Sequence, residues 1–128
     1  MKRATRFSAS MMSDAKWRKF FGVVASHSEQ VFSANWKLVD ERGPITGGLP
    51  RSKDVWESAV DGCLNGPVTY AEIEWIELPK SVPYRPYANA PIKQTAQNLA
   101  PLRQALEATG KFPIEDTEDG FRIYGYHR

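Results

Sequence analysis

The chain has 128 residues, of which 41% are hydrophobic and 25% are charged, and this composition supports one folded domain with a single core. Its 17 basic and 15 acidic residues leave a formal charge of +2, which argues against a domain-wide attraction to nucleic acid or membrane surfaces. The single cysteine, Cys63, excludes an internal disulfide, and no apolar run is long enough to cross a bilayer. We therefore expect a cytoplasmic protein without a membrane segment.

The first eleven residues carry three basic side chains but lack the apolar stretch of a secretory signal. We expect residues 1–11 to form a disordered tail and residues 12–128 to form a single domain. Because Met11 and Met12 stand directly before a helix-start signal, a natural start at this point is an alternative.

A helix is predicted to begin at Ser13 or Asp14, since either side chain can accept hydrogen bonds from the free N–H groups of the first turn. It should end near residues 26–28, where short polar residues compete with helical hydrogen bonds. Its apolar face has helical spacing and consists of Trp17, Phe20, Phe21 and Val24.

Residues 30–40 alternate between apolar and polar side chains, which predicts a half-buried strand with Trp36 on its core face. Glycines and prolines in residues 41–51 predict a loop. The apolar spacing in residues 52–64 is compatible with a short helix, although Gly62 weakens it by about 1 kcal/mol relative to alanine.

Residues 68–78 are predicted to form the longest strand, and four prolines predict an extended, irregular segment over residues 79–93. A second helix is predicted to begin at Thr95 or Asn98 and to end at Gly110. Its apolar face consists of Leu99, Leu102 and Leu106.

Residues 112–115 and 121–126 flank a turn that contains Asp119 and Gly120, which predicts a C-terminal hairpin. The order of elements lacks the regular strand–helix alternation of a doubly wound fold. We therefore predict an α+β domain, with an antiparallel sheet of about four strands and two main helices packed on one face.

Two glutamates, Glu72 and Glu74, are predicted to project from one face of the long strand with side chains roughly 7 Å apart. This separation suits paired-carboxylate chemistry if burial beside an aromatic ring raises the pKa of one carboxyl group. Two solvated glutamates are the simpler interpretation. Cys63 and the two histidines are not spaced as a metal site, so we predict neither a metal nor another cofactor. A nucleophile pair of Cys63 with a histidine is geometrically possible, and a small core cysteine is the simpler interpretation.

Tyr84, Arg85 and Tyr87 lie in the proline-stiffened segment, where large side chains can bind a partner at low entropic cost. We predict a binding surface there, with a rigid connector packed on the domain as the alternative. Tyr124 is a further candidate if it lines a pocket. The turn of the C-terminal hairpin carries four carboxylates, at Glu115, Asp116, Glu118 and Asp119. They could recognise a basic partner or weakly hold calcium, although they lack the ligand order of a calcium-binding loop, and a solvated turn is the simpler interpretation.

Three segments resemble a family of small uncharacterised bacterial proteins. They are the Lys16-Trp17 helix opening, the Glu-Ile-Glu-Trp-Ile-Glu-Leu-Pro run at residues 72–79, and the Phe-Arg-Ile-Tyr-Gly-Tyr run at residues 121–126. The resemblance covers about residues 12–128. It implies a bacterial cytoplasmic protein and brings no activity, cofactor or site residue with it.

The leading hypothesis is a non-enzymatic domain that binds another protein, and an immunity-type protein that neutralises a toxin is one form of it. The first alternative is a small enzyme or small-ligand binder that uses Glu72, Glu74 and nearby tyrosines. The second alternative is a weak nucleic-acid binder, which the charge balance disfavours.

Overall fold

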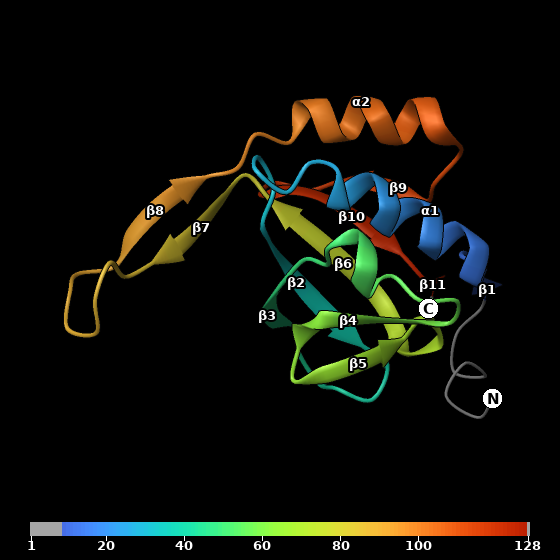
Figure 1. Cartoon of the computed structure of the whole chain (residues 1–128), viewed down its shortest axis with the longest axis horizontal. Coiled ribbons are helices and arrows are strands. Elements are labelled where there is room, and N and C mark those ends of the chain that lie inside the picture. Colours follow the sequence, from blue (N-terminus) through green and yellow to red (C-terminus); the bar gives the residue numbers. More distant parts are fainter. Residues whose placement is uncertain (1–8, 128) are drawn as a thin grey trace.

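The structure is a computed structural model that describes residues 9–127. Its main sheet contains β2 Ser33–Leu38, β3 Ile45–Gly48, β6 Ile73–Pro79, β9 Ile114–Asp116 and β10 Gly120–Tyr124. These strands are antiparallel and lie in the order β3-β2-β6-β10-β9 (Figure 1). Two α-helices, α1 Asp14–Ala25 and α2 Ala100–Thr109, pack into the same core. The predicted α+β class is confirmed, with a main sheet of five strands.

The first helix begins as the sequence predicts. Ser13 Oγ accepts a hydrogen bond from Lys16 N at 3.1 Å, which satisfies one free donor of the first turn. The helix ends at Ala25, at the edge of the predicted polar stretch. Its apolar face is buried as expected, through Trp17, Phe20, Phe21 and Val24.

Phe21 lies within the aromatic part of the core. Its ring stacks on Trp17, Trp36 and Tyr70, with centroid distances of 5.6, 5.7 and 5.9 Å. Each such pair contributes about 0.5–1.5 kcal/mol beyond the burial of apolar area. Trp36 belongs to β2 and is fully buried, which confirms the predicted core face of this strand.

The predicted short helix over residues 52–64 is wrong. Only Ser52–Asp54 forms a helical turn, the 3-10 turn η2, and β4 Ala59–Leu64 then pairs with β5 Gly66–Thr69 as an antiparallel hairpin. Gly62 adopts a φ of 80°, a left-handed conformation that does not continue a helix and that favours glycine. The hairpin β4–β5 contributes Val60, Cys63 and Val68 to the core.

The predicted strand over residues 68–78 is divided into two strands, β5 and β6 Ile73–Pro79. A 3-10 turn, η3 Tyr70–Glu72, separates β5 from β6. Glu72 Oε2 stabilises this turn, because it accepts hydrogen bonds from Thr69 N and Thr69 Oγ1, both at 2.8 Å. The chain therefore leaves the hairpin β4–β5 and enters the middle of the main sheet as β6. The predicted loop over residues 41–51 likewise contains a strand, β3.

The segment that we predicted to be extended and irregular is a hairpin. β7 Ser81–Tyr84 pairs antiparallel with β8 Lys93–Ala96, and the hairpin projects from the rest of the domain (Figure 1). We call residues 81–96 the arm. Pro83 is tolerated within β7 because a two-stranded ribbon uses only part of its N–H groups in pairing.

The second helix begins later than predicted, at Ala100. Thr95 lies within β8, and the N-cap position is occupied by Leu99, whose side chain makes no capping hydrogen bond, so Asn98 is not the cap either. Proline stands in the first turn and Gly110 at the C-terminal end, as the sequence predicts. The buried side chains of α2 are Leu102 and Leu106.

The predicted C-terminal hairpin is confirmed as β9 and β10. A short strand, β11 Tyr126–His127, follows it and pairs with β1 Ala9–Ser10. Met11 N also donates a hydrogen bond to Gly125 O at 2.8 Å. Residues 9–11, which we assigned to the tail, are therefore bonded to the domain, and the predicted disorder of residues 1–8 lies outside the described residues.

Candidate functional site

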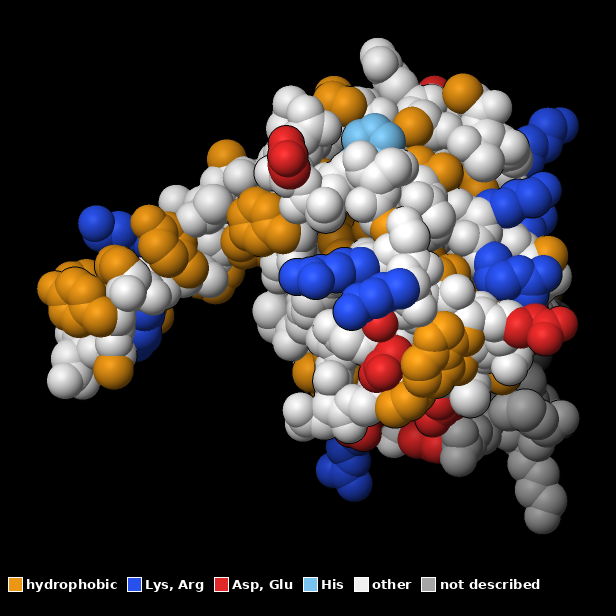
Figure 2. All heavy atoms as spheres, viewed as in Figure 1, with side chains coloured by type: hydrophobic (Ala, Val, Ile, Leu, Met, Phe, Trp, Pro, Cys, Tyr) orange, Lys and Arg blue, Asp and Glu red, His pale blue; other side chains and the backbone are white. Residues whose placement is uncertain are grey.

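The arm carries a group of exposed hydrophobic side chains (Figure 2). Within residues 9–127, six large apolar side chains are exposed, and three of them lie on the arm. These three are Tyr84, Tyr87 and Ile92, with 44%, 68% and 58% of their surface accessible. Exposed apolar side chains that cluster in this way indicate an interaction surface, whereas scattered ones do not.

The tip of the arm is held by its own hydrogen bonds. Arg85 Nη1 donates to Ala90 O at 2.8 Å, and Ala90 N donates to Tyr87 O at 3.0 Å. The predicted site residues Tyr84, Arg85 and Tyr87 are therefore brought together on an ordered turn. The arm and the residues beside it carry three cations and no carboxylate between Pro79 and Asn98, namely Lys80, Arg85 and Lys93.

Gln97 fixes the arm to the domain, and only 5% of the surface of this residue is accessible. Its Oε1 accepts from Phe32 N at 2.8 Å and from Ser33 N at 2.9 Å. Its Nε2 donates to Ser33 O at 3.1 Å and to Pro79 O at 2.8 Å. One amide thus joins the end of the arm to β2 and β6, and the arm leaves the domain in a defined direction. Sequence reasoning missed Gln97, since a lone glutamine carries no pattern.

A cleft of about 540 Å³ lies where the arm meets the turn between β9 and β10. The backbones of the two elements are joined there, because Lys80 N donates to Asp119 O at 2.6 Å. The side of the cleft formed by the arm includes Pro83 and Gln94, and the turn contributes Glu118 and Asp119. Asn35 and Thr46 from β2 and β3 of the main sheet also line it, together with the residues at the base of the arm, which include Lys80.

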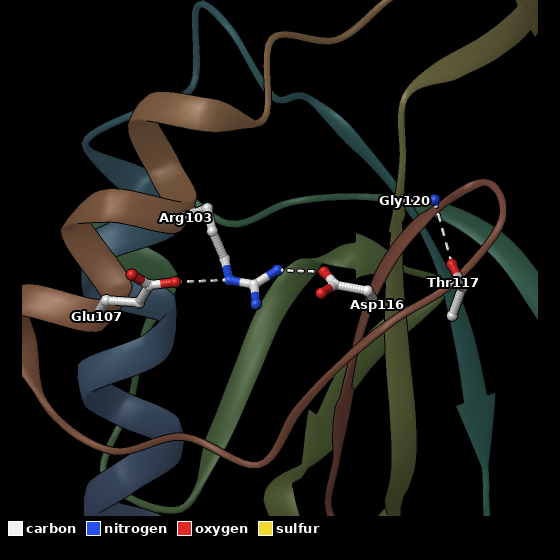
Figure 3. A network of polar contacts seen from close by, with 5 residues as sticks. All are labelled: Arg103, Glu107, Asp116, Thr117 and Gly120. Atoms are coloured by element: carbon white, nitrogen blue, oxygen red, sulfur yellow. Dashed lines mark hydrogen bonds and ion pairs between the residues drawn. The ribbon is translucent and has the colours of Figure 1, made fainter.

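The acidic turn, residues 115–119, is attached to α2 by a network of polar contacts (Figure 3). Arg103 donates to Asp116 Oδ1 at 2.5 Å and to Glu107 Oε1 at 3.0 Å. The Arg103 guanidinium lowers the pKa of the Asp116 carboxyl group through its hydrogen bond and its charge. Thr117 Oγ1 accepts from Gly120 N at 3.1 Å and closes the turn.

The face of the main sheet opposite the helices carries a second polar cluster. The strand register places Lys37, Trp75 and Tyr124 on neighbouring strands, on the face opposite Trp36 and its partners. The Arg122 guanidinium carbon lies 3.8 Å from the centroid of the Trp75 ring, and its Nη2 lies 3.3 Å from Glu77 Oε2. Arg122 therefore makes a cation–π contact with Trp75 and also pairs with the buried carboxylate of Glu77.

Tyr124 joins this cluster and does not line the cleft at the base of the arm. Its hydroxyl donates to Glu115 Oε1 at 3.1 Å, and its ring stacks on His127 with a centroid distance of 5.1 Å. Tyr124 is thus separated from the arm residues with which it was grouped as a candidate.

The structure does not bring Glu72 and Glu74 together as an exposed pair on one strand. Glu72 belongs to η3 and caps Thr69, as described above. Glu74 is an extra residue in β6, because Lys37 pairs with Trp75 and Leu38 pairs with Ile73. At this bulge Glu74 is buried and its Oε1 lies 3.1 Å from Lys37 Nζ. The expected strand geometry behind the acid/base alternative is therefore wrong.

A family model described as a family of unknown function, DUF6678, matches residues 2–128. The chain belongs to this family. No curated protein and no solved structure matches the chain. The expected resemblance to an uncharacterised family is confirmed, and the bacterial origin stays a prediction.

In this member of DUF6678, Cys63 is a core residue of the hairpin β4–β5. Burial raises the pKa of its thiol to about 12, and the carboxylates of Asp54 and Asp61 add smaller contributions. Among residues 9–127, no three histidine, cysteine or carboxylate side chains are grouped so as to hold a metal ion. In the same part of the chain, no helix is long and apolar enough to span a membrane.

Proposed function

We propose that this chain is a protein-binding domain that docks on an acidic protein surface through its arm. The observation that carries the proposal is the anchored hairpin that exposes Tyr84, Tyr87 and Ile92 away from the domain core. These side chains add nothing to the core, and hydrogen bonds at the tip and at Gln97 hold the hairpin that carries them. Preorganised aromatic side chains lose little entropy on binding, which favours them as interaction hot spots.

The charge of the arm supports an acidic partner. All three ionised side chains between Pro79 and Asn98 are basic, although the whole chain is nearly balanced at +2. Charge complementarity speeds the encounter and excludes wrong partners more than it adds affinity, so the aromatic side chains supply most of the binding energy. A toxin that the chain neutralises would be one such partner, as expected from the sequence.

The test is quantitative capture from native cells with the full-length chain. In the arm variant, Tyr84→Ser, Tyr87→Ser and Ile92→Ser are combined. The matched control combines Phe32→Ser, Ile45→Ser and Trp56→Ser, which alter the other three exposed large apolar side chains. We expect the wild type and the control to recover the same partner, and the arm variant to recover it at least about tenfold less.

Equal recovery of every partner by the arm variant and the wild type would exclude the arm as the docking element. Circular dichroism spectra of the three proteins should coincide, because all six positions are exposed and make no contribution to the buried core.

A further inference from the structure

The acidic turn of this chain is itself a surface of the kind that the arm would recognise. Residues 114–121 carry four carboxylates and no cation. Two of the four already have intramolecular partners, since Asp116 binds Arg103 and Glu115 accepts from Tyr124. The other two, Glu118 and Asp119, are exposed and border the cleft at the base of the arm.

The basic and aromatic groups lie at the other end of the same arm. Arg85 and Tyr87 belong to the tip, and Lys93 pairs with Tyr84 at the outer end of the ladder. All four side chains are exposed. The tip and the cleft are therefore separated by the length of one arm, and the tip cannot fold back into the cleft of its own chain without breaking the ladder of β7 and β8.

In a dimer with a two-fold axis, the tip of one copy can reach the cleft of the other copy. When two arms lie side by side in opposite directions, the tip of each arm lies at the base of the other. The distance from tip to base is the same in both copies, so both contacts form at once. An isologous interface of this kind is self-complementary and closes at two copies.

We infer that two copies of this chain form a symmetric dimer through reciprocal contacts, in which the arm of each copy binds the cleft of the other. The tip of each arm enters the cleft of the second copy, where Arg85 and Lys93 face Glu118 and Asp119. Tyr87, the most exposed of the large apolar side chains in residues 9–127, supplies the apolar contact against Pro83. This inference rests on the proposed role of the arm as a docking element and names a second copy as its partner.

The experiment is sedimentation equilibrium on the purified full-length chain at low salt, with concentrations up to roughly 1 mM so that weak association is detected. The arm-reversed variant combines Arg85→Glu and Lys93→Glu. The turn-reversed variant combines Glu118→Lys and Asp119→Lys. The control combines Lys16→Glu and Lys19→Glu, which make the same charge change on the exposed side of α1.

We expect the wild type and the control to dimerise, and each reversed variant to dissociate at least about tenfold more readily because like charges meet at both contacts. An equimolar mixture of the two reversed variants should regain the dimer. In that mixed pair, the acidic arm meets a basic turn and the basic arm meets an acidic turn. A variant that had merely unfolded would not be rescued by mixing.

A monomeric wild type would overturn the inference, and so would a dimer that neither reversal weakens or that mixing fails to restore. These outcomes are distinguishable from failure of the proposed function. If the chain is monomeric while the arm variant still loses its captured partner, the arm docks on a different protein. If the arm variant captures its partner as well as the wild type does and the arm-reversed variant keeps the dimer, both proposals fail.

Discussion

Two hairpins of this protein differ in their position relative to the core. The hairpin β4–β5 folds onto the core and buries Val60, Cys63 and Val68. The arm stands away from the domain and, across residues 81–96, buries Val82 and Ala90 while it exposes its larger apolar side chains. A two-stranded hairpin therefore stabilises the core in one place and forms an exposed surface in the other.

The largest expected effect on stability comes from cutting the connection between the arm and the domain. Gln97→Ala leaves two N–H groups and two carbonyl groups without their buried partner. We expect the free energy of unfolding to fall by about 3 kcal/mol, measured by urea denaturation. Arg85→Ala, which removes a hydrogen bond at the exposed tip, is the control and should cost less than about 1 kcal/mol. Equal losses would contradict the anchoring role of Gln97.

Truncating one side chain in each hairpin tests the comparison directly. Val60→Ala removes fully buried methyl groups from β4 and should cost about 2 kcal/mol. Tyr84→Ala removes a larger but exposed side chain from β7 and should change stability by no more than about 0.5 kcal/mol. If Tyr84→Ala proved the more destabilising of the two, the arm would belong to the folded core and not to a docking surface.

A third test compares the reactivity of one thiol in each hairpin. It requires the smallest change in stability of the three tests. Because its pKa is raised to about 12, the Cys63 thiol stays protonated at pH 8 and reacts slowly with a disulfide reagent. A cysteine introduced by Tyr84→Cys, in a Cys63→Ser background, is exposed and should react at least about 100-fold faster. Raising the pH from 8 to 10 should accelerate Cys63 about tenfold per pH unit, because its thiolate fraction keeps rising below its raised pKa, whereas the exposed cysteine should level off above its ordinary pKa of about 8.5. Similar rates at the two sites would show that β4–β5 opens readily.

The elements whose periodicity agreed with their burial could be predicted from the sequence. In α1, one capping serine and a face of aromatic residues define both the start and the orientation of the helix. In β2, the alternation around Trp36 identified the core face. These patterns are local, so neighbours far along the chain do not alter them.

The errors arose where one pattern fits two structures. The apolar spacing in residues 52–64 suits a helix, but Asn65 and Gly66 lie at the turn of a hairpin, and that turn signal favoured two strands. The capping pair Thr69 and Glu72 was also readable and would have divided the predicted long strand.

The candidate site was only partly predictable. The aromatic residues of the arm stood out by type, and the prolines showed that the segment is extended. Its projection from the domain depends on Gln97, whose partners Phe32 and Ser33 lie more than sixty positions earlier in the chain. The meeting of Glu118 and Asp119 with the base of the arm is equally a matter of tertiary contacts, which no local pattern records.

The pairing of β1 with β11 has a practical consequence, since Ala9 lies opposite His127. A short linker could join these two positions, and the chain could then be opened at Asn89 in the tip of the arm. Such a circular permutant would keep the core elements and their connections, and its two new ends would be the two strands of the arm. A permutant that folds would make the arm a pair of free ends to which labels or other domains can be fused.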